Sequence, residues 1–571
     1  MITPPLLQPN TPYSATPLLT AWLRANNITA IQTDLSLELL SRLFSTDGID
    51  ILHRELLSLD TGNAPYFLTQ APRYRAAVNG VMRLLRGLDS DDALRLCRRG
   101  TLPEGPQLEN AWRAADQLYA TFGQPGREMA RHLASRFLDD IADAATVADP
   151  HFAFSRYAEK PAVYLPQFAP MKQTVEESDT IFTRWLDELT DEEMRRHSPD
   201  ITAITVPFPG CLFGALRIAR RIKRQYPNIH VTLGGGYINT ELRNLRDPAI
   251  FDFIDSITFD SGMRPLQRLI EYTENGGNRD RLVRTMMNVN GKLEYFDSGE
   301  SPTPHNSLPA PIYDGLHIDR YFGLMETLNP VTRLWSDGKW NRLLLAHGCC
   351  WSRCAFCDTS LDYIRRYDPA EPKTICDWME SMVAHSGHSG FHFVDESLPP
   401  DLISNVCDEI LARNMQVSWW GNIRFEKRFS SELIGKMAAA GCIAVTGGLE
   451  TVCDRTLKLM HKGISVKGAT YVMENLANAG ILVHAYLMYG FPTQTKTETY
   501  AAIETVDKLF ESGILHSAYW HRFALTAHSE IASHPDRFSI ILLDELPATF
   551  ARNEIPFDGH FEYDLDSLPC G

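Results

Sequence analysis

The chain has 571 residues, of which 44% are hydrophobic and 22% charged, and its formal net charge is −16. This length predicts several domains, each able to bury its own core. The acidic balance disfavours a nucleic-acid partner, because binding a phosphate backbone needs a basic face. The sequence has no apolar run of membrane-spanning length and no signal peptide at its N-terminus. Eleven cysteines, three of them clustered, suit a reducing compartment, so we expect a cytoplasmic protein without a membrane partner.

The N-terminal segment 2–40 reads as strand, loop, helix and strand, which is how an α/β cofactor-binding layer begins. We expect the helix at Thr16–Asn26 and the second strand at Ile28–Gln32. From about Leu37 to Asp149 apolar residues recur at intervals of three and four, interrupted by Gly and Pro breaks. This pattern predicts a helical insertion, which is either a bundle packed on a neighbouring domain or a cap that shapes substrate access.

Strands and helices alternate again from Asp200. A strand at Ile201–Phe208 leads into an amphipathic helix, and the next strand ends at the glycine triplet Gly234, Gly235 and Gly236. A glycine turn directly after a parallel strand lets a bulky ligand approach the backbone, although many α/β proteins have such a turn. Residues 274–340 are rich in Gly, Pro, Ser and Asp, and they predict a connector with at most one short hairpin.

A cysteine-rich loop follows the buried strand expected at Leu343–Ala346. It carries Cys350, Cys354 and Cys357, whose CxxxCxxC spacing lets three thiols converge on one metal centre without closing a four-ligand zinc site. The adjacent Cys349 is a poor fourth ligand, because neighbouring side chains on an extended loop point apart. Thiolates are the usual ligands of a [4Fe–4S] cluster, and three of them leave one iron open to another ligand. A zinc knuckle or a chance grouping is the alternative.

Five further strands alternate with helices after this loop. Together with the first strand they predict a partial parallel (β/α)6 barrel, whose ligand site lies at the carboxyl ends of the strands. The expected strands are 391–394, 418–424, 443–446, 482–488 and 518–525. Four histidines near the last strand, His516, His521, His528 and His534, have no metal-ligand spacing, and only His521 is a candidate to face the cavity.

The cysteine loop, with the aromatic Phe356 before its last cysteine, resembles that of the radical S-adenosylmethionine (SAM) superfamily. Residues 2–32 and 200–239 resemble the cobalamin-binding domain that precedes the barrel in one subgroup of this superfamily. The resemblance implies an α/β chain with a Rossmann-like cobalamin-binding domain, a helical insertion and a radical SAM barrel. The implied domains are the cobalamin-binding layer at 1–40 and 195–275, the insertion at 41–194, a connector at 276–335, the barrel at 336–535 and a C-terminal tail at 536–571.

The resemblance also implies a [4Fe–4S] cluster on Cys350, Cys354 and Cys357, with SAM beside it. Besides Phe356, the candidate SAM contacts are Asp395, Glu396, Arg424, Glu450 and Gly490. The carboxylates at 395 and 396 are expected to accept hydrogen bonds from the SAM ammonium, unless they cap the next helix. The residue at 450 is expected to accept the ribose hydroxyls, since a buried carboxylate without a partner is costly. The guanidinium at 424 pairs with the methionine carboxylate or with Glu426 or Asp395. Gly490 packs on adenine or only makes a turn.

Cobalamin contacts are expected at Thr205, Gly234, Gly235 and Gly236. The loop from Pro9 to Ser14 contains no histidine, although this is where the wider cobalamin-binding pattern supplies an imidazole below cobalt. The resemblance therefore implies a cobalt without a protein imidazole from that loop.

The implied function is reductive cleavage of SAM at the cluster and, with cobalamin, methylation of an unactivated carbon. The implied partners are a small-molecule or peptide substrate and a reducing partner such as flavodoxin or ferredoxin. One alternative is a cyclase or rearrangement enzyme that uses the same cofactors without net methylation. The other is a non-catalytic cobalamin or redox sensor, against which the intact cysteines and Glu450 speak.

Overall fold

The computed structural model describes residues 1–59, 63–88, 91–152, 165–274, 276–543 and 548–559. These residues form two compact units. The first comprises the described residues within 1–238, 246–300 and 313–339, and the second comprises 239–245, 301–312 and the described residues from 340 onward. Among the described helices, none combines the length and the apolar composition that a bilayer span requires.

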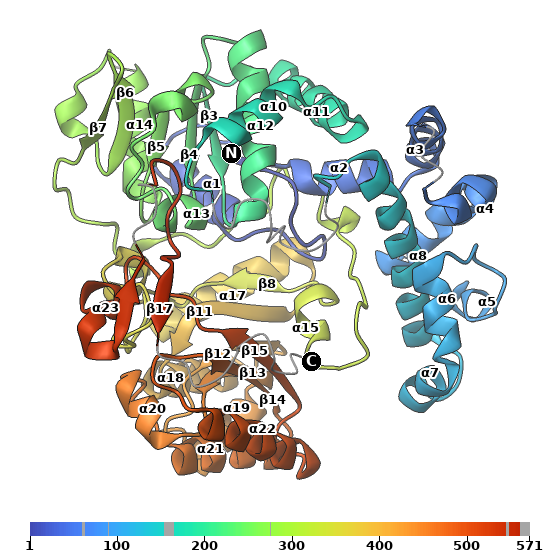
Figure 1. Ribbon diagram of the computed structural model, residues 1–571, viewed down its shortest axis with the longest axis vertical. Helices are drawn as coiled ribbons and strands as arrows, with labels where there is room; N and C mark the ends of the chain where they lie inside the picture. The colour runs from blue at the N-terminus through green and yellow to red at the C-terminus, as the bar shows by residue number, and fades with distance from the viewer. Residues whose placement is uncertain (60–62, 89–90, 153–164, 275, 544–547, 560–571) are drawn as a thin grey trace. The chain divides into compact units, whose positions relative to one another are not determined.

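The first unit is built on a mixed sheet, whose described strands follow the order β2-β1-β3-β4-β5-β6-β7 (Figure 1). β1 to β5 run parallel, and β6 and β7 are antiparallel to their neighbours. The strands are β1 (Ile2–Thr3), β2 (Thr33–Asp34), β3 (Ile201–Thr205), β4 (His230–Gly234), β5 (Ser256–Thr258), β6 (Thr285–Val289) and β7 (Lys292–Phe296). The helices beside them are α1 (Ala15–Ala25), α12 (Leu212–Gln225), α13 (Gly236–Thr240) and α14 (Met263–Glu274).

One sequence-based boundary in this unit is wrong. The second strand lies at Thr33–Asp34 rather than at Ile28–Gln32, because the pairing of Ile2 with Thr33 sets the register. The short hairpin that the sequence allows within 274–340 is formed by β6 and β7. Its Asn290-Gly291 turn has positive φ at both residues, as a two-residue hairpin requires, and the hairpin pairs with β5 at the edge of the sheet.

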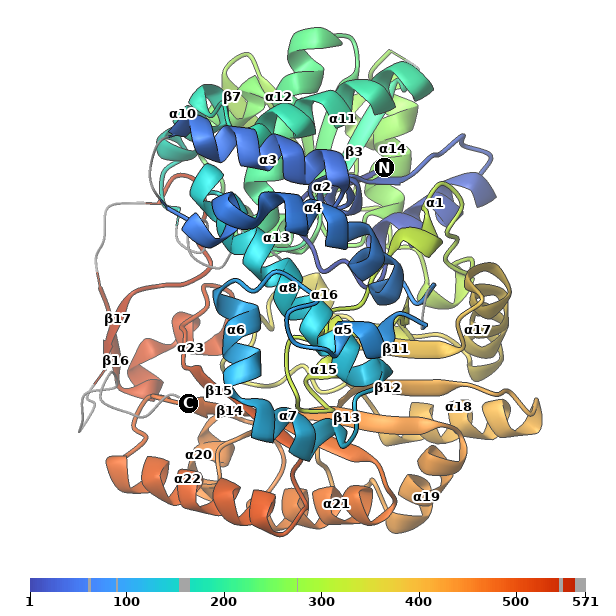
Figure 2. The ribbon, with the colours of Figure 1, turned by 90° about the vertical axis from the view of Figure 1, so that its right-hand side faces the viewer.

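The helical insertion packs around α8 (Arg127–Ala148), which contacts five neighbouring helices, α3 to α7 (Figure 2). Most of the side chains of α8 are buried, and its small residues allow close helix packing. The remaining helices are α2 (Leu35–Leu43), α3 (Thr46–Leu59), α4 (Pro65–Leu85), α5 (Ala93–Leu96), α6 (Pro106–Arg113), α7 (Ala115–Phe122), α10 (Ala169–Glu177) and α11 (Ile181–His197). α10 and α11 pack on α12 beside the sheet. Parts of the predicted insertion, residues 60–62, 89–90 and 153–164, lie outside the described residues.

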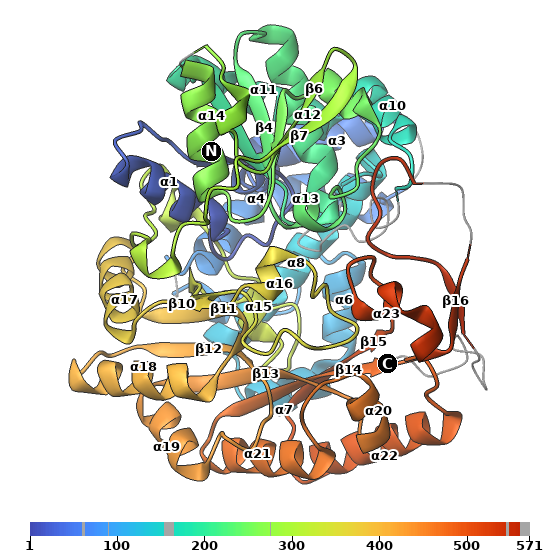
Figure 3. The ribbon, with the colours of Figure 1, turned by 90° about the vertical axis from the view of Figure 1, so that its left-hand side faces the viewer.

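The second unit contains the predicted open barrel. The described strands of the barrel are all parallel, in the order β15-β14-β13-β12-β11-β8, and helices cover one face of this sheet (Figure 3). The strands are β8 (Asn341–Leu343), β11 (Gly390–Leu398), β12 (Ser418–Ile423), β13 (Cys442–Glu450), β14 (Leu482–Tyr489) and β15 (Ser517–Arg522). The helices are α17 (Pro372–Ser386), α18 (Pro400–Ala412), α19 (Ser431–Ala439), α20 (Asp454–Leu459), α21 (Val466–Asn478) and α22 (Lys496–Glu511).

Several short elements complete the structure. In the first unit, α15 (Arg333–Ser336) follows the hairpin. In the second unit, β9 (Ala346–His347) pairs with β10 (Asp368–Pro369), and α16 (Asp362–Arg365) lies between them in sequence. After the barrel come α23 (Glu530–Ser533) and the antiparallel pair of β16 (Ile540–Leu542) and β17 (Phe557–Gly559). Residues 544–547 and 560–571 of the predicted C-terminal tail lie outside the described residues.

Candidate active site

The predicted cysteine loop, residues 348–360, begins where β9 ends. Gly348 has a φ of +78°, and a Cβ at this position would lie 1.9 Å from the carbonyl oxygen of Arg366. Only glycine fits such a close approach of two backbone segments. The loop therefore leaves the strand at a sharp turn, which places its cysteines at the carboxyl end of the barrel strands.

The four thiols of the loop fall into two pairs. A hydrogen bond between Cys354 and Cys357 lowers the pKa of the first thiol and raises that of the second. The Cys350 thiol donates to the carbonyl of Ser397 at 3.4 Å, and Cys349 lies beside it. In the described part of the chain, no three His, Cys, Asp or Glu side chains gather closely enough to hold one metal ion.

In a [4Fe–4S] cluster each thiolate binds a different iron, so three cysteines of one loop can hold the cluster without meeting at one metal ion. Cys349, Cys354 and Cys357 line a cavity of about 250 Å³. The choice of Cys350 rather than Cys349 as the third ligand stays a prediction.

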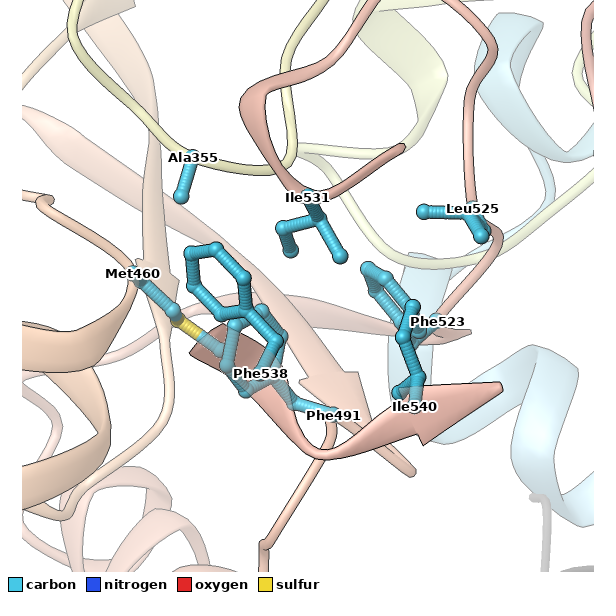
Figure 4. Close-up of a cluster of buried hydrophobic side chains, with 8 residues drawn as sticks. All are labelled: Ala355, Met460, Phe491, Phe523, Leu525, Ile531, Phe538 and Ile540. Carbon is cyan, nitrogen blue, oxygen red and sulfur yellow. The ribbon is translucent and has the colours of Figure 1, made fainter. Parts of the chain in front are cut away.

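A buried hydrophobic cluster anchors the cysteine loop. The Ala355 N–H donates to the carbonyl of Met460 at 2.9 Å, and the Ala355 carbonyl accepts from the Ile531 N–H at 3.1 Å. Figure 4 shows this cluster, which joins the loop to residues that follow the barrel. Its members are Ala355, Met460, Phe491, Phe523, Leu525, Ile531, Phe538 and Ile540. Phe356 packs against this cluster and also lines the cavity, and its contact with SAM stays a prediction.

The two carboxylates near the end of β11 have different surroundings. Asp395 is 1% exposed and accepts hydrogen bonds from the backbone N–H groups of Leu345 and Ala346, at 3.0 and 2.8 Å. Burial raises its pKa to about 7, although these hydrogen bonds act in the opposite direction. Its oxygens thus hold the segment that enters the cysteine loop.

Glu396 lines the cavity, and its side chain is exposed there, whereas that of Asp395 is buried. The alternative that these carboxylates cap the following helix is wrong, because Pro399 is the N-cap of α18. Of the two, Glu396 is therefore placed to meet a ligand, and both predicted SAM contacts stay predictions.

Glu450 ends β13 with a φ of +60° and lines the same cavity. Its Oε1 accepts a hydrogen bond from the Lys462 ammonium at 2.6 Å, and both side chains are about nine-tenths buried. Burial lowers the pKa of Lys462, but the charges of Glu450 and Cys354 outweigh it, so the pKa lies above its ordinary value. Gly448 is the reason the pair fits, since a Cβ there would lie 2.0 Å from Glu450 Oε1.

Arg424 also lines the cavity and is 6% exposed. Its guanidinium lies 3.8 Å above the ring of Trp351 and donates to Glu426 at 3.4 Å, so its carboxylate partner in the structure is Glu426 rather than Asp395. Gly490 is buried and has a φ of +73° at the end of β14. Its contact with adenine stays a prediction.

Trp351, Lys462 and Tyr486 are among the cavity-lining residues that sequence reasoning missed. The strand alternation on β14 could have indicated Tyr486, because the neighbours on either side are buried under the helices. His521 lies beside it, with ring centroids 5.8 Å apart, and its side chain is exposed. No local pattern marks Lys462, whose role depends on a partner twelve positions away.

In the first unit, the predicted cobalamin contacts lie at the carboxyl ends of β3 and β4. Gly235 has a φ of +112°, and a Cβ there would lie 2.7 Å from the Val206 carbonyl oxygen, while one at Gly236 would lie 2.7 Å from that of Pro207. Protein backbone thus fills the space that a side chain at either position would need. Thr205 is buried at the end of β3, and its Oγ1 lacks a hydrogen-bond partner among the described residues.

A separate, mainly apolar cavity of about 170 Å³ is lined largely by α10, α11 and the residues that follow α8. Pro5 and Leu6, which follow β1, and Pro209 and Gly210, which follow β3, complete its lining. The strand order 2-1-3-4-5 reverses direction between β1 and β3, and open α/β sheets bind ligands at such switch points. The contacts of Thr205 and Gly234–Gly236 with cobalamin stay predictions.

The profile of the Radical SAM superfamily matches residues 345–506, which include the cysteine loop and most of the barrel. These residues form a radical SAM domain. An uncharacterized methyltransferase of Pyrococcus horikoshii is 22% identical over 325 residues, which are 55% of this chain and 66% of the relative. Cytidylyl-2-hydroxyethylphosphonate methyltransferase of Streptomyces wedmorensis is 22% identical over 189 residues, which are 32% of this chain and 34% of the relative. The chain thus spans less than two thirds of either relative.

Two solved structures resemble the chain beyond the radical SAM domain. TsrM from Kitasatospora setae, with cobalamin and a [4Fe–4S] cluster bound, has a TM-score of 0.50 at 16% identity, over 65% of this chain and 76% of TsrM. OxsB, a cobalamin-dependent SAM radical enzyme with aqua-cobalamin and SAM bound, has a TM-score of 0.51 at 14% identity. The match covers 65% of this chain and 58% of OxsB. At such identities the likeness concerns the fold, an α/β sheet unit together with a radical SAM barrel.

Proposed function

We propose that this chain is a cobalamin-dependent radical SAM methyltransferase acting on a small-molecule or peptide substrate. The observation that carries the proposal is the cavity at the carboxyl ends of the barrel strands, where thiols, carboxylates and two buried cations meet. When bound, the cluster and cobalamin supply one-electron cleavage of SAM and a transferable methyl group. The protein holds the reactants in line and excludes water.

The cavity offers a complementary group for each polar part of SAM. Glu396 is placed to accept from the ammonium, and Arg424 to bind the methionine carboxylate. One oxygen of Glu450 is held by Lys462, which leaves the other for the ribose hydroxyls. Phe356 gives the cavity an apolar wall beside Cys357. These roles follow from charge and position, with Cys350, Cys354 and Cys357 as the cluster ligands.

Three observations support a role for cobalamin. The parallel sheet of the first unit has its switch point between β1 and β3, and the residues that follow these strands line part of a mainly apolar cavity. Thr205 presents a buried hydroxyl in need of a partner at the same edge. TsrM and OxsB, which resemble the chain in fold, hold cobalamin in their structures, and the two relatives in sequence are named methyltransferases.

The test uses the full chain, purified anaerobically and loaded with iron, sulfide and cobalamin. With SAM labelled at the methyl group and a low-potential reductant, we expect the label to reach cobalamin and then a product heavier by one methyl. 5′-Deoxyadenosine and S-adenosylhomocysteine should both form. A product without the added mass of a methyl group would contradict methylation and favour the second candidate function, described next.

That second candidate is a ring-forming or rearranging enzyme with the same cofactors. It is kept because OxsB is described by its cofactors and radical chemistry rather than as a methyltransferase. A third outcome, intact SAM after reduction of the loaded protein, would contradict both enzymes and favour a sensor. The physiological electron donor, such as a flavodoxin or ferredoxin, belongs to the proposal as well.

A further inference from the structure

The buried ion pair of Glu450 and Lys462 lies in the cavity that the cysteine loop lines. Removing two charges from water is expensive, and a buried pair often adds little to stability. The Lys462 ammonium also lies 5.8 Å from the ring centroid of Phe356, the residue that precedes Cys357. A fixed positive charge therefore stands beside the predicted cluster ligands.

Backbone and ring contacts fix the position of Lys462 relative to the cysteine loop. The Met460 carbonyl accepts from the Ala355 N–H at 2.9 Å, and the His461 carbonyl accepts from the Trp351 indole N–H at 2.8 Å. Gly463 packs under Trp351, where a Cβ would lie 2.2 Å from the ring. The residues on both sides of Lys462 are thus joined to the loop that carries the cysteines.

We propose that Lys462 is a positioning residue that makes the cluster easier to reduce, with Glu450 acting in the opposite direction. The proposal rests on the proposed function, because it needs a cluster on the cysteine loop. Reduction adds one electron, and a low-polarity cavity strengthens the attraction between the added negative charge and a nearby ammonium. Net charge and surrounding dipoles set the reduction potentials of iron–sulfur clusters.

The experiment is a redox titration of the reconstituted full chain without SAM, followed by the electron paramagnetic resonance signal of the reduced cluster. Lys462→Met should shift the midpoint potential to more negative values, by about tenfold in the one-electron equilibrium, or 59 mV. Glu450→Gln should shift it to more positive values. Lys462→Arg keeps the charge and should stay near the wild type.

Lys458→Met is the matched control, because it removes the same charge from an exposed side chain four residues earlier. Its midpoint should equal that of the wild type. If Lys462→Met loads too little cluster to titrate, the double variant Lys462→Met/Glu450→Gln removes both charges together. Its midpoint should lie between that of Glu450→Gln and the value expected for Lys462→Met.

The proposal is overturned if Lys462→Met keeps the wild-type midpoint, if the double variant has the same midpoint as Glu450→Gln, or if both single variants shift the midpoint in the same direction. Shifts of equal sign would indicate loss of packing rather than of charge. Failure of the proposed function looks different, because the wild type itself would then bind no cluster or leave SAM intact.

Discussion

The two sheets of this chain place their chemistry in different ways. In the parallel barrel, charged and polar side chains follow the strand ends directly, and they line one cavity together with the cysteine loop. In the mixed sheet, the glycine turn after β4 packs on the backbone of Val206 and Pro207, and the neighbouring cavity is apolar. A cluster and SAM need charged ligands at fixed points, which a local motif can supply. A large cofactor that is held through many surface contacts requires no short motif, so its site is harder to recognise in the sequence.

The largest effects are expected from the cysteine loop. Cys354→Ala and Cys357→Ala should each abolish cluster loading and SAM cleavage, because each thiolate binds one iron of the cluster. Cys350→Ala should do the same and Cys349→Ala should retain both, as measured by iron content and 5′-deoxyadenosine. Since Cys349 lines the cavity and Cys350 bonds to Ser397, the reverse result would move the third ligand to position 349.

The second prediction concerns the hydrophobic cluster that anchors this loop. Phe538 is 2% exposed, and replacing it with alanine should cost about 3–5 kcal/mol in the free energy of unfolding of the second unit. Ile541→Ala is the control, because Ile541 follows three residues later and is 64% exposed. Its effect should stay within about 0.5 kcal/mol. Equal denaturation midpoints for the two variants would mean that the cluster does not support the loop.

This cluster shows where sequence reasoning stops. The strand order of the barrel could be predicted, because the hydrophobic periodicity of each strand and each helix is visible in the sequence. The segment 536–571 was expected to be a tail, whereas Phe538 and Ile540 belong to the core beneath the cysteine loop. A few apolar residues in a polar stretch carry no local signal, and only the folded chain brings them to Ala355.

The candidate site divides in the same way. That Cys354, Cys357, Glu396, Arg424 and Glu450 lie near one another could be predicted, because they belong to a spaced motif or follow strands directly. Lys462 could not, since its placement depends on left-handed backbone at Glu450 and His461 and on the absence of a side chain at Gly448. In the first unit, the glycine triplet was read correctly as a turn, but its close neighbour is backbone.

The third prediction tests that neighbour. Gly235→Ala is destabilised both by a positive φ and by a collision of its Cβ with the Val206 backbone. In Gly291→Ala, in the β6–β7 turn, the Cβ has nothing within 4 Å, so only the positive φ destabilises the variant. The first variant should therefore lose about 1–3 kcal/mol more stability than the second. Hydrogen exchange of β4 and α13 measures the difference. Equal losses in the two variants would mean that the turn has room for a side chain, and hence for a ligand.

The last prediction concerns the pH dependence of stability in each unit. Asp140 on α8 is fully buried and accepts from the N–H groups of Gly105 and Gln107 at the start of α6, at 3.0 and 2.7 Å. Burial raises its pKa from an ordinary value of 3.8 to about 7. Between these values the folded chain keeps a proton that the unfolded chain has lost. Its contribution to stability therefore falls as the pH rises, by at most about 1.4 kcal/mol per pH unit, and levels off above pH 7.

Asp140→Asn removes this titration, so the stability of the helical insertion should change less between pH 5 and 7. The variant should be less stable than the wild type at pH 5, because asparagine has one hydrogen-bond-accepting oxygen fewer. Asp143→Asn makes the same charge change at an exposed position of α8. Because burial is the main cause of the raised Asp140 pKa and the charge of Asp143 the smallest, this variant should keep most of the pH dependence. Asp395, whose pKa is also raised to about 7, should keep the pH dependence of the barrel in both variants. Hydrogen exchange of α6 and of β11, followed separately over this pH range, resolves the two units. An unchanged slope at α6 in Asp140→Asn would mean that another group titrates there.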